Sequence, residues 1–171
     1  DTVFSLNTAF TDTRYWRLGG NAGTTPGTQF LGTADNQPLE LKINSLRALR
    51  LEPVAESPNV VIGHSGNAVT VGVGGATIGG GGNLTEPNLV RSPFGTISGG
   101  VGNAISTDSG ATTIGGGWLN AIGASSAYAS VGGGSHNTAG AISATVAGGF
   151  GNDALGQDSV VGGGYTNSAA S

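Results

Sequence analysis

A short motif of alternating polar and apolar positions recurs through the C-terminal two thirds of the chain. Its shared form is [Thr/Ser]-[Val/Ile]-x-Gly-Gly-x-x-Asn-x-Ala, with clear copies reading TISGGVGNA, TIGGGWLNA, SVGGGSHNTA, TVAGGFGNDA and VVGGGYTNSA. VIGHSGNA and TIGGGGN are weaker first copies. Alignment on the asparagine after each glycine cluster gives intervals of 16, 20, 17, 17, 15 and 15 residues. The aligned asparagines are Asn67, Asn83, Asn103, Asn120, Asn137, Asn152 and Asn167.

This period predicts a parallel β-roll, or solenoid, of about seven coils with 15–17 residues each. Repeats built from pairs of helices need more than about 30 residues, whereas two short strands and two turns fit this length. Such coils stack at the strand spacing of roughly 4.8 Å, and only stacking buries their inner face. The 20-residue interval contains LTEPNLVRSPFG, which we expect to form a loop.

The inner face is expected to hold two rows of side chains, and the asparagines a third. Glycine permits the tight turns between the strands. The asparagines are expected to stack in register and to hydrogen-bond the backbone of the turns. One inward row comprises Ile97, Ile114, Val131, Val146 and Val161, and the other comprises Ala104, Ala121, Ala139, Ala154 and Ala169.

The N-terminal part has a different pattern. Leu39, Leu41 and Ile43 alternate with polar residues, as in a half-buried strand, and the Asn44-Ser45 step permits a turn into a returning strand. A short helix over residues 45–51 is the alternative. PVAESP at 53–58 is typical of a linker. We therefore expect an N-terminal β module at 1–56 and a repeat domain at 57–171, together forming a fragment of a longer chain.

Composition narrows the function classes. Hydrophobic residues make up 37% of the chain and charged residues 9%, which argues against disorder driven by charge. Six Lys and Arg residues against ten acidic ones give a net charge of −4, so the chain lacks the basic surface that binds nucleic acid. There is no cysteine for a disulfide or a thiolate metal site. No apolar run reaches the roughly 18 residues typical of a membrane-spanning helix.

SVGGGSHNTAG (130–140) and SVVGGGYTNSA (159–169) are similar to the repeat S-V-A-I-G-x-x-S-x-A-x-G of YadA-like heads in trimeric autotransporter adhesins. The resemblance covers roughly residues 60–171. It implies a left-handed parallel β-roll, three chains side by side, and a role as an extracellular adhesin or fibre head on a bacterial surface. The sequence departs from the family where Gly133, Gly149 or Gly163 replaces the second inward aliphatic residue, which thins the core.

WRLGGNAGTTPGTQFLGTADNQPLELKIN resembles a module found beside such heads in bacterial and phage tail-fibre-like proteins. The two resemblances together imply a non-enzymatic structural fibre or adhesin head. A receptor-binding segment of a phage or phage-like tail fibre, located on the virion, is one alternative. A spike hydrolase acting on polysaccharides is another.

The residues themselves favour no catalytic, metal or cofactor site. The chain contains no G-x-G-x-x-G and no Gly-Lys-Ser/Thr, so the common nucleotide-binding signatures are absent. The Gly-Gly-x-Gly-x-Asp motif of calcium-binding repeats does not recur from copy to copy, because its one match is GGFGND at 148–153 and the other copies place asparagine without the following aspartate. Ser135, His136 and Asp153 make a triad on paper, but the polarity of turns explains them better. Asp153 and Asp158 would serve a glycosidase only across a groove. We therefore expect no catalytic residue, no metal and no cofactor.

One outward position carries aromatic residues. The residues four places after each Val/Ile anchor are Val101, Trp118, Ser135, Phe150 and Tyr165. The aromatic ones either form an exposed stripe that stacks on sugars or grips a surface, or they pack between chains. The candidate ligand-binding residues are Trp118, Phe150, Tyr165 and His136. The expected partners are further copies of the chain in a homotrimer, and a host-surface protein or glycan.

A second, weaker candidate surface is a row of hydroxyl groups, formed by Thr96, Thr113, Ser130 and Thr145. Such a row suggests ice binding, but the repeats lack the Thr-x-Thr pairs that this function requires.

Overall fold

The computed structural model describes residues 16–170 and divides the chain into two compact units, Asp1–Ala34 and Asp35–Ser171. Residues 16–34 of the first unit form turns and bends without a strand. The expected β module at 1–56 includes residues 1–15, which lie outside the described range. The structure divides the chain between residues 34 and 35 rather than near 56, because the strands at 39–52 pair with the repeat region.

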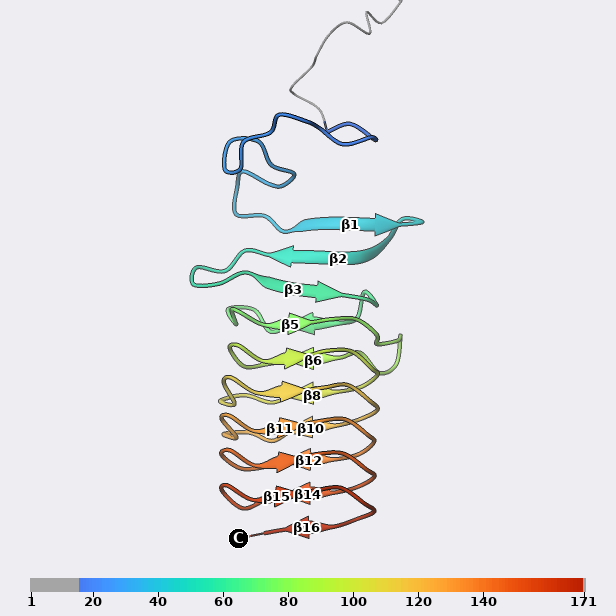
Figure 1. The fold of residues 1–171 in the computed structure, drawn as a ribbon, viewed down its shortest axis with the longest axis vertical. Helices are drawn as coiled ribbons and strands as arrows, with labels where there is room; N and C mark the ends of the chain where they lie inside the picture. Colours follow the sequence, from blue (N-terminus) through green and yellow to red (C-terminus); the bar gives the residue numbers. More distant parts are fainter. Residues whose placement is uncertain (1–15, 171) are drawn as a thin grey trace, which may run out of the picture. The chain divides into compact units, whose positions relative to one another are not determined.

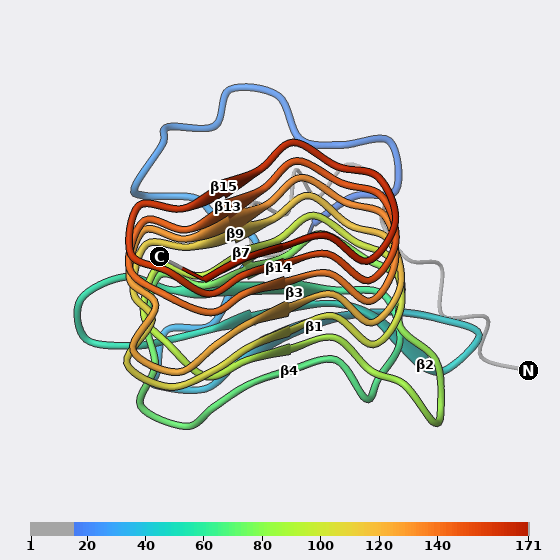
Figure 2. The same ribbon diagram turned by 90° about the horizontal axis from the view of Figure 1, so that it is seen from below.

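The second unit is a parallel β-solenoid of about six turns, and no helix occurs among residues 16–170. Its stacked coils place two sheets against each other (Figure 1). Viewed along the stack, successive coils nearly superimpose (Figure 2). The first sheet runs in the order β1 (Leu39–Ile43), β2 (Leu46–Glu52), β3 (Asn59–Ile62), β5 (Thr77–Ile78), β7 (Thr96–Ile97), β9 (Thr113–Ile114), β11 (Ser130–Val131), β13 (Thr145–Val146) and β15 (Val160–Val161). The second sheet runs β4 (Ala68–Val69), β6 (Leu89–Val90), β8 (Ala104–Ile105), β10 (Ala121–Ile122), β12 (Thr138–Ala139), β14 (Asp153–Ala154) and β16 (Ser168–Ala169).

The core consists of two rows of small aliphatic side chains, one from each sheet. The expected row on the first sheet is confirmed and extends to earlier coils: it comprises Val61, Ile78, Ile97, Ile114, Val131, Val146 and Val161, all buried. On the second sheet the buried or partly buried row is Val69, Val90, Ile105, Ile122, Ala139, Ala154 and Ala169. Each member of the second row lies two residues after an asparagine, which is buried in every coil except the last.

The second inward row corrects the sequence-based prediction at two positions. Ala121 pairs with Ala104 on one side and with Thr138 on the other, so both alanines lie one residue away from the inward row. Strand side chains alternate between faces, and a shift of one residue therefore moves a side chain to the other face. Ile105 and Ile122 take the inward positions and are fully buried.

A ladder of buried asparagines joins the coils at one corner. The backbone N–H of Asn137 donates to Asn120 Oδ1 at 3.0 Å, and its own Oδ1 accepts from the N–H of Asn152 at 3.0 Å. Its Nδ2 donates to Gly133 O within the coil and to Gly149 O in the next coil, both at 2.9 Å. Each rung therefore satisfies backbone groups that would otherwise be buried without partners. The asparagines of this ladder are Asn67, Asn88, Asn103, Asn120, Asn137, Asn152 and Asn167.

Asn83 does not belong to the ladder, and Asn88 takes the place predicted for it. The Oδ1 of Asn83 accepts from the backbone N–H of Thr85 at 2.9 Å and of Glu86 at 2.7 Å, and the residue is exposed. The extra residues of this coil therefore precede the ladder asparagine instead of following it. For the same reason, part of the expected loop LTEPNLVRSPFG forms β6 and takes part in the regular coil.

The N-terminal end of the first sheet is closed by a hairpin, as the alternation over 39–51 predicts. β1 pairs antiparallel with β2, and Asn44 and Ser45 turn the chain with φ of 48° and 63°, a combination typical of a type I′ turn. β2 also pairs antiparallel with β3, the first strand of the repeat region. The segment 53–58 is therefore the loop of a second hairpin, which joins β2 to the repeat region.

Arg47 on β2 completes hydrogen bonds that no preceding coil supplies. Within the stack, the carbonyl of a ladder asparagine accepts from the coil before it, as Asn137 O does from Ala121 N at 2.9 Å. Asn67 is the first rung, and its carbonyl accepts from Arg47 Nη2 at 2.8 Å. The same Nη2 atom donates to Ser65 O at 2.9 Å and to His64 O at 3.2 Å.

We expect Arg47→Ala to lower the free energy of unfolding by about 1–3 kcal/mol, because it leaves the carbonyl of a buried residue without its charged donor. Denaturant unfolding followed by circular dichroism measures the change. Arg91→Ala removes the same charge from an exposed position and serves as the control. Equal stability of the two variants would show that Arg47 does not cap the stack.

Candidate functional site

The residues predicted to form an outward stripe follow one another along the stack. Parallel β-bridges join Val101 to Trp118, Trp118 to Ser135, Ser135 to Phe150, and Phe150 to Tyr165. The register is fixed by the backbone, since the N–H at each of the first four positions donates to the carbonyl of a glycine in the next coil at 2.9 Å. One outward side chain per coil is therefore held at the spacing of the stack.

Four rings form a continuous row, which we call the aromatic stripe: Trp118, His136, Phe150 and Tyr165. Trp118 and His136 meet edge to face with centroids 4.8 Å apart, and His136 and Phe150 lie 5.4 Å apart. Phe150 and Tyr165 are parallel within 10° at 5.3 Å. The side chains of Trp118, Phe150 and Tyr165 are 46%, 44% and 72% exposed, so the stripe is open to solvent.

His136 fills the gap that serine leaves in the stripe. It follows Ser135 in the chain and has a φ of 57°, a left-handed conformation that places its ring between those of Trp118 and Phe150. Ser135 Oγ lies 2.7 Å from His136 Nδ1, and this hydrogen bond fixes the ring. The structure thus brings together all four residues that the sequence suggested as candidates for ligand binding.

Glu86 lies at the N-terminal end of the stripe, and no motif in the sequence singles it out. It belongs to the extra segment before Asn88, where the Asn83 turn and a hydrogen bond from Gly102 N to Glu86 O at 3.1 Å hold the backbone. Its Oε2 accepts from the Trp118 indole Nε1 at 2.7 Å, across 32 residues of sequence. The sequence shows that this coil is longer than the others, but it does not show where the extra residues fold.

The ladder asparagines take no part in this surface. Asn67, Asn88, Asn103, Asn120, Asn137 and Asn152 are buried at 0–1% exposure, and their polar atoms bond backbone groups or one another. Their role in the described part of the chain is to join coils.

The arrangement offers little support for catalysis or metal chemistry. Ser135 and His136 form a hydrogen-bonded pair, but across residues 16–170 no carboxylate is found bonded to the histidine ring. His64 Nδ1 accepts from Gly66 N, in the first coil. Asp153 lies on β14, whereas Asp158 lies in the following turn. Within the described range, no three His, Cys, Asp or Glu side chains gather closely enough to hold a metal ion.

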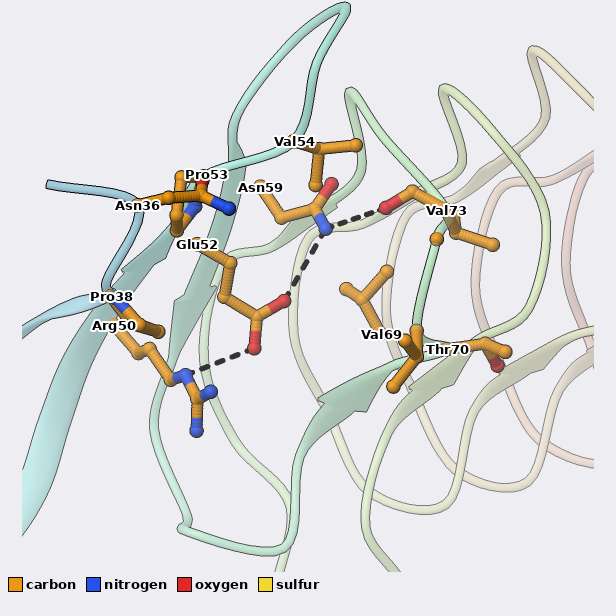
Figure 3. A pocket seen from close by; sticks show the side chains of 12 residues that line it. Asn36, Pro38, Arg50, Glu52, Pro53, Val54, Asn59, Val69, Thr70 and Val73 are labelled. Atoms are coloured by element: carbon orange, nitrogen blue, oxygen red, sulfur yellow. Dashed lines mark hydrogen bonds and ion pairs between the residues drawn. The ribbon is translucent and has the colours of Figure 1, made fainter.

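A hollow of about 220 Å³ near the hairpin is the second candidate site (Figure 3). The Glu52 carboxylate lies between Arg50 Nε at 3.0 Å and Asn59 Nδ2 at 3.3 Å, and faces Val69 and Val73 across the gap. The charges of Glu52 and Arg50 therefore already neutralise each other. The volume is below the roughly 300–1,000 Å³ of typical ligand pockets. The aromatic stripe is therefore the stronger candidate.

Comparisons of the chain with protein-family models, with curated protein sequences and with solved structures found no match. The described residues include no helix long and apolar enough to cross a bilayer.

Proposed function

We propose that this chain is a non-enzymatic structural segment of an extracellular fibre or adhesin head, and that it attaches to another surface through the aromatic stripe. The exposed row of four rings is the observation that carries this proposal. Large aromatic side chains that remain open to water on a rigid framework are typical of binding surfaces. A bacterial cell surface is the proposed location, with a virion tail fibre as the alternative.

The framework suits such a role because the stack fixes the stripe without help from a ligand. The asparagine ladder and the two aliphatic rows hold each coil against the next, and the rings add contacts only at the outer surface. Sites on rigid elements keep their geometry better than sites on loops, so binding costs little ordering entropy.

We expect the triple variant Trp118→Ser, Phe150→Ser and Tyr165→Ser to lose surface attachment by at least about tenfold while keeping its fold, because the three side chains are largely exposed. The wild type is screened against immobilised matrix proteins and a glycan array, and the variant is then measured on every surface that binds. Val71→Ser with Tyr128→Ser is the matched control, since these residues are 99% and 69% exposed and belong neither to the stripe nor to the segment that holds Glu86.

The same proteins are weighed in solution by light scattering, because the rings could pack between the chains of the proposed homotrimer instead. An oligomer that becomes monomeric in the triple variant would contradict the attachment role. An unchanged mass with lost attachment would support it. Attachment that survives the triple substitution would also contradict the proposal.

A further inference from the structure

The polar atoms beside the aromatic stripe indicate the chemical class of its ligand. Ser135 Oγ, the imidazole of His136, the Tyr165 hydroxyl and the Glu86 carboxylate all belong to the row or border it. A dry protein–protein contact would have to bury these groups, which costs free energy unless each finds a partner. A ligand that presents both C–H faces and hydroxyl groups satisfies the rings and the polar atoms together. Carbohydrates have this combination.

The spacing of the rings suits a linear chain of sugars. Neighbouring centroids along the stripe are 4.8, 5.4 and 5.3 Å apart, one step per coil. A pyranose in an extended, β-1,4-linked chain advances by a similar distance. Phe150 and Tyr165 are parallel within 10°, with centroids 5.3 Å apart, and they are 44% and 72% exposed. Both rings therefore keep area that a ligand can contact.

Charge restricts the class further. The chain carries a net charge of −4, and Glu86 places a carboxylate at one end of the stripe. In the described part of the molecule, no lysine or arginine is found hydrogen-bonded or ion-paired to a residue of the stripe. Glycans that carry uronate or sulfate groups would be repelled, whereas hydroxyl groups can donate to the carboxylate of Glu86.

We infer that the aromatic stripe binds a linear, uncharged glycan that lies parallel to the stack, with one sugar over each coil from Trp118 to Tyr165. This inference rests on the proposed attachment function and names its ligand class. It requires only the exposed rings, the polar groups beside them and the coil spacing.

The test uses intrinsic fluorescence, because Trp118 becomes the only tryptophan once Trp16 is replaced by phenylalanine. Cello-oligosaccharides and chito-oligosaccharides, from the dimer to the hexamer, are titrated into the Trp16→Phe chain, and calorimetry checks the affinities. We expect affinity to rise with each sugar up to about four and then to level off, as the rings are used in turn. Oligogalacturonate of equal length is expected to bind at least about tenfold more weakly.

Calorimetry with three variants separates the contributions of the two rings and of Glu86 to glycan binding. Phe150→Ala and Tyr165→Ala are each expected to weaken tetramer binding by about tenfold or more. Glu86→Gln keeps an oxygen acceptor for the indole of Trp118 but removes the negative charge, and we expect the affinity for oligogalacturonate to rise relative to that for the uncharged oligomers. Tyr128→Ser, at an exposed position outside the stripe, is expected to leave all affinities unchanged. Thermal unfolding establishes that each variant is folded.

Several results would overturn the inference. They are affinities independent of oligomer length, equal or tighter binding of oligogalacturonate, or absence of binding to all uncharged oligomers on the array and in solution. If none of the oligomers binds while the triple variant still loses attachment to a protein-coated surface, the glycan class is wrong and the attachment function stands. If the triple variant attaches normally, both proposals fail.

Discussion

Replacement of Gly100 by alanine is expected to lower the free energy of unfolding by about 2–5 kcal/mol, since it combines a strained backbone with a steric clash. Gly100 has a φ of 83°, and a Cβ on it would overlap the backbone carbonyl of Gly117 in the next coil. The same Cβ would lie 2.7 Å from Asn103 Nδ2, inside the asparagine ladder. The two coils would have to separate locally to admit it. Denaturant unfolding measured by circular dichroism gives the size of the effect.

Gly110→Ala is the matched control for this substitution. Gly110 does not have a positive φ, and the nearest atom to an added Cβ is Pro93 O at 3.5 Å, an ordinary contact. The same position in the next two coils carries Ala127 and Ile142, so a side chain fits there. We expect stability to be unchanged or raised by up to about 1 kcal/mol. Similar losses in both variants would mean that the close approach of coils at Gly100 does not limit the structure.

Asn137→Asp is expected to destabilise the protein by about 3–5 kcal/mol at neutral pH, although the two side chains have nearly the same shape. Aspartate cannot donate to the carbonyls of Gly133 and Gly149, which Nδ2 reaches at 2.9 Å. It would instead place a buried carboxylate 3.1 Å from Asn120 Oδ1. Burial among oxygen acceptors would raise the pKa of the new carboxyl above its unfolded value. The folded state would then bind more protons than the unfolded state, and the loss of stability would shrink as the pH falls toward 4.

Asn83→Asp makes the same chemical change outside the ladder. The hydrogen bonds of this side chain to Thr85 and Glu86 use Oδ1 as the acceptor, a role that a carboxylate also fills. We expect a change within about 0.5 kcal/mol and little dependence on pH. Unfolding curves of both variants between pH 4 and 8 provide the comparison. A stable Asn137→Asp chain with a flat pH profile would contradict the role assigned to the ladder.

The repeated positions were predictable where local sequence determines them. The asparagine after each glycine cluster belongs to the ladder in six of the seven predicted positions, and Val131 and its equivalents identify one inward row. The exception at Asn83 arose because insertion of extra residues moves the true rung to Asn88, and both asparagines follow the same glycine cluster. The inward row of the second sheet was misplaced at Ala104 because Ala and Ile are adjacent there and both are apolar.

The parts that sequence could not supply depend on contacts between distant residues. The turn at Asn44-Ser45 predicted the first hairpin, but nothing local indicated that β2 would pair with β3 and close the stack. The row of side chains that contains Trp118 could be predicted from the spacing of the repeats. The position of the His136 ring could not, because it depends on the left-handed backbone of His136, one residue after Ser135 in that row. Glu86 reaches Trp118 across a loop whose path is set by tertiary contacts.

The hairpin of β1 and β2 also defines where folding can begin and in which order it proceeds. The strands of each coil pair only with strands of the coils directly before and after it, so paired strands are about one repeat apart in the chain. Such local pairing has low contact order and can propagate from one end. The hairpin precedes the coils in the chain and is synthesised before them. Each coil that follows then meets a formed sheet edge whose backbone donors and acceptors are already aligned. The stack can therefore form coil by coil in the order of translation, because each strand pairs with a strand that was synthesised about one repeat earlier.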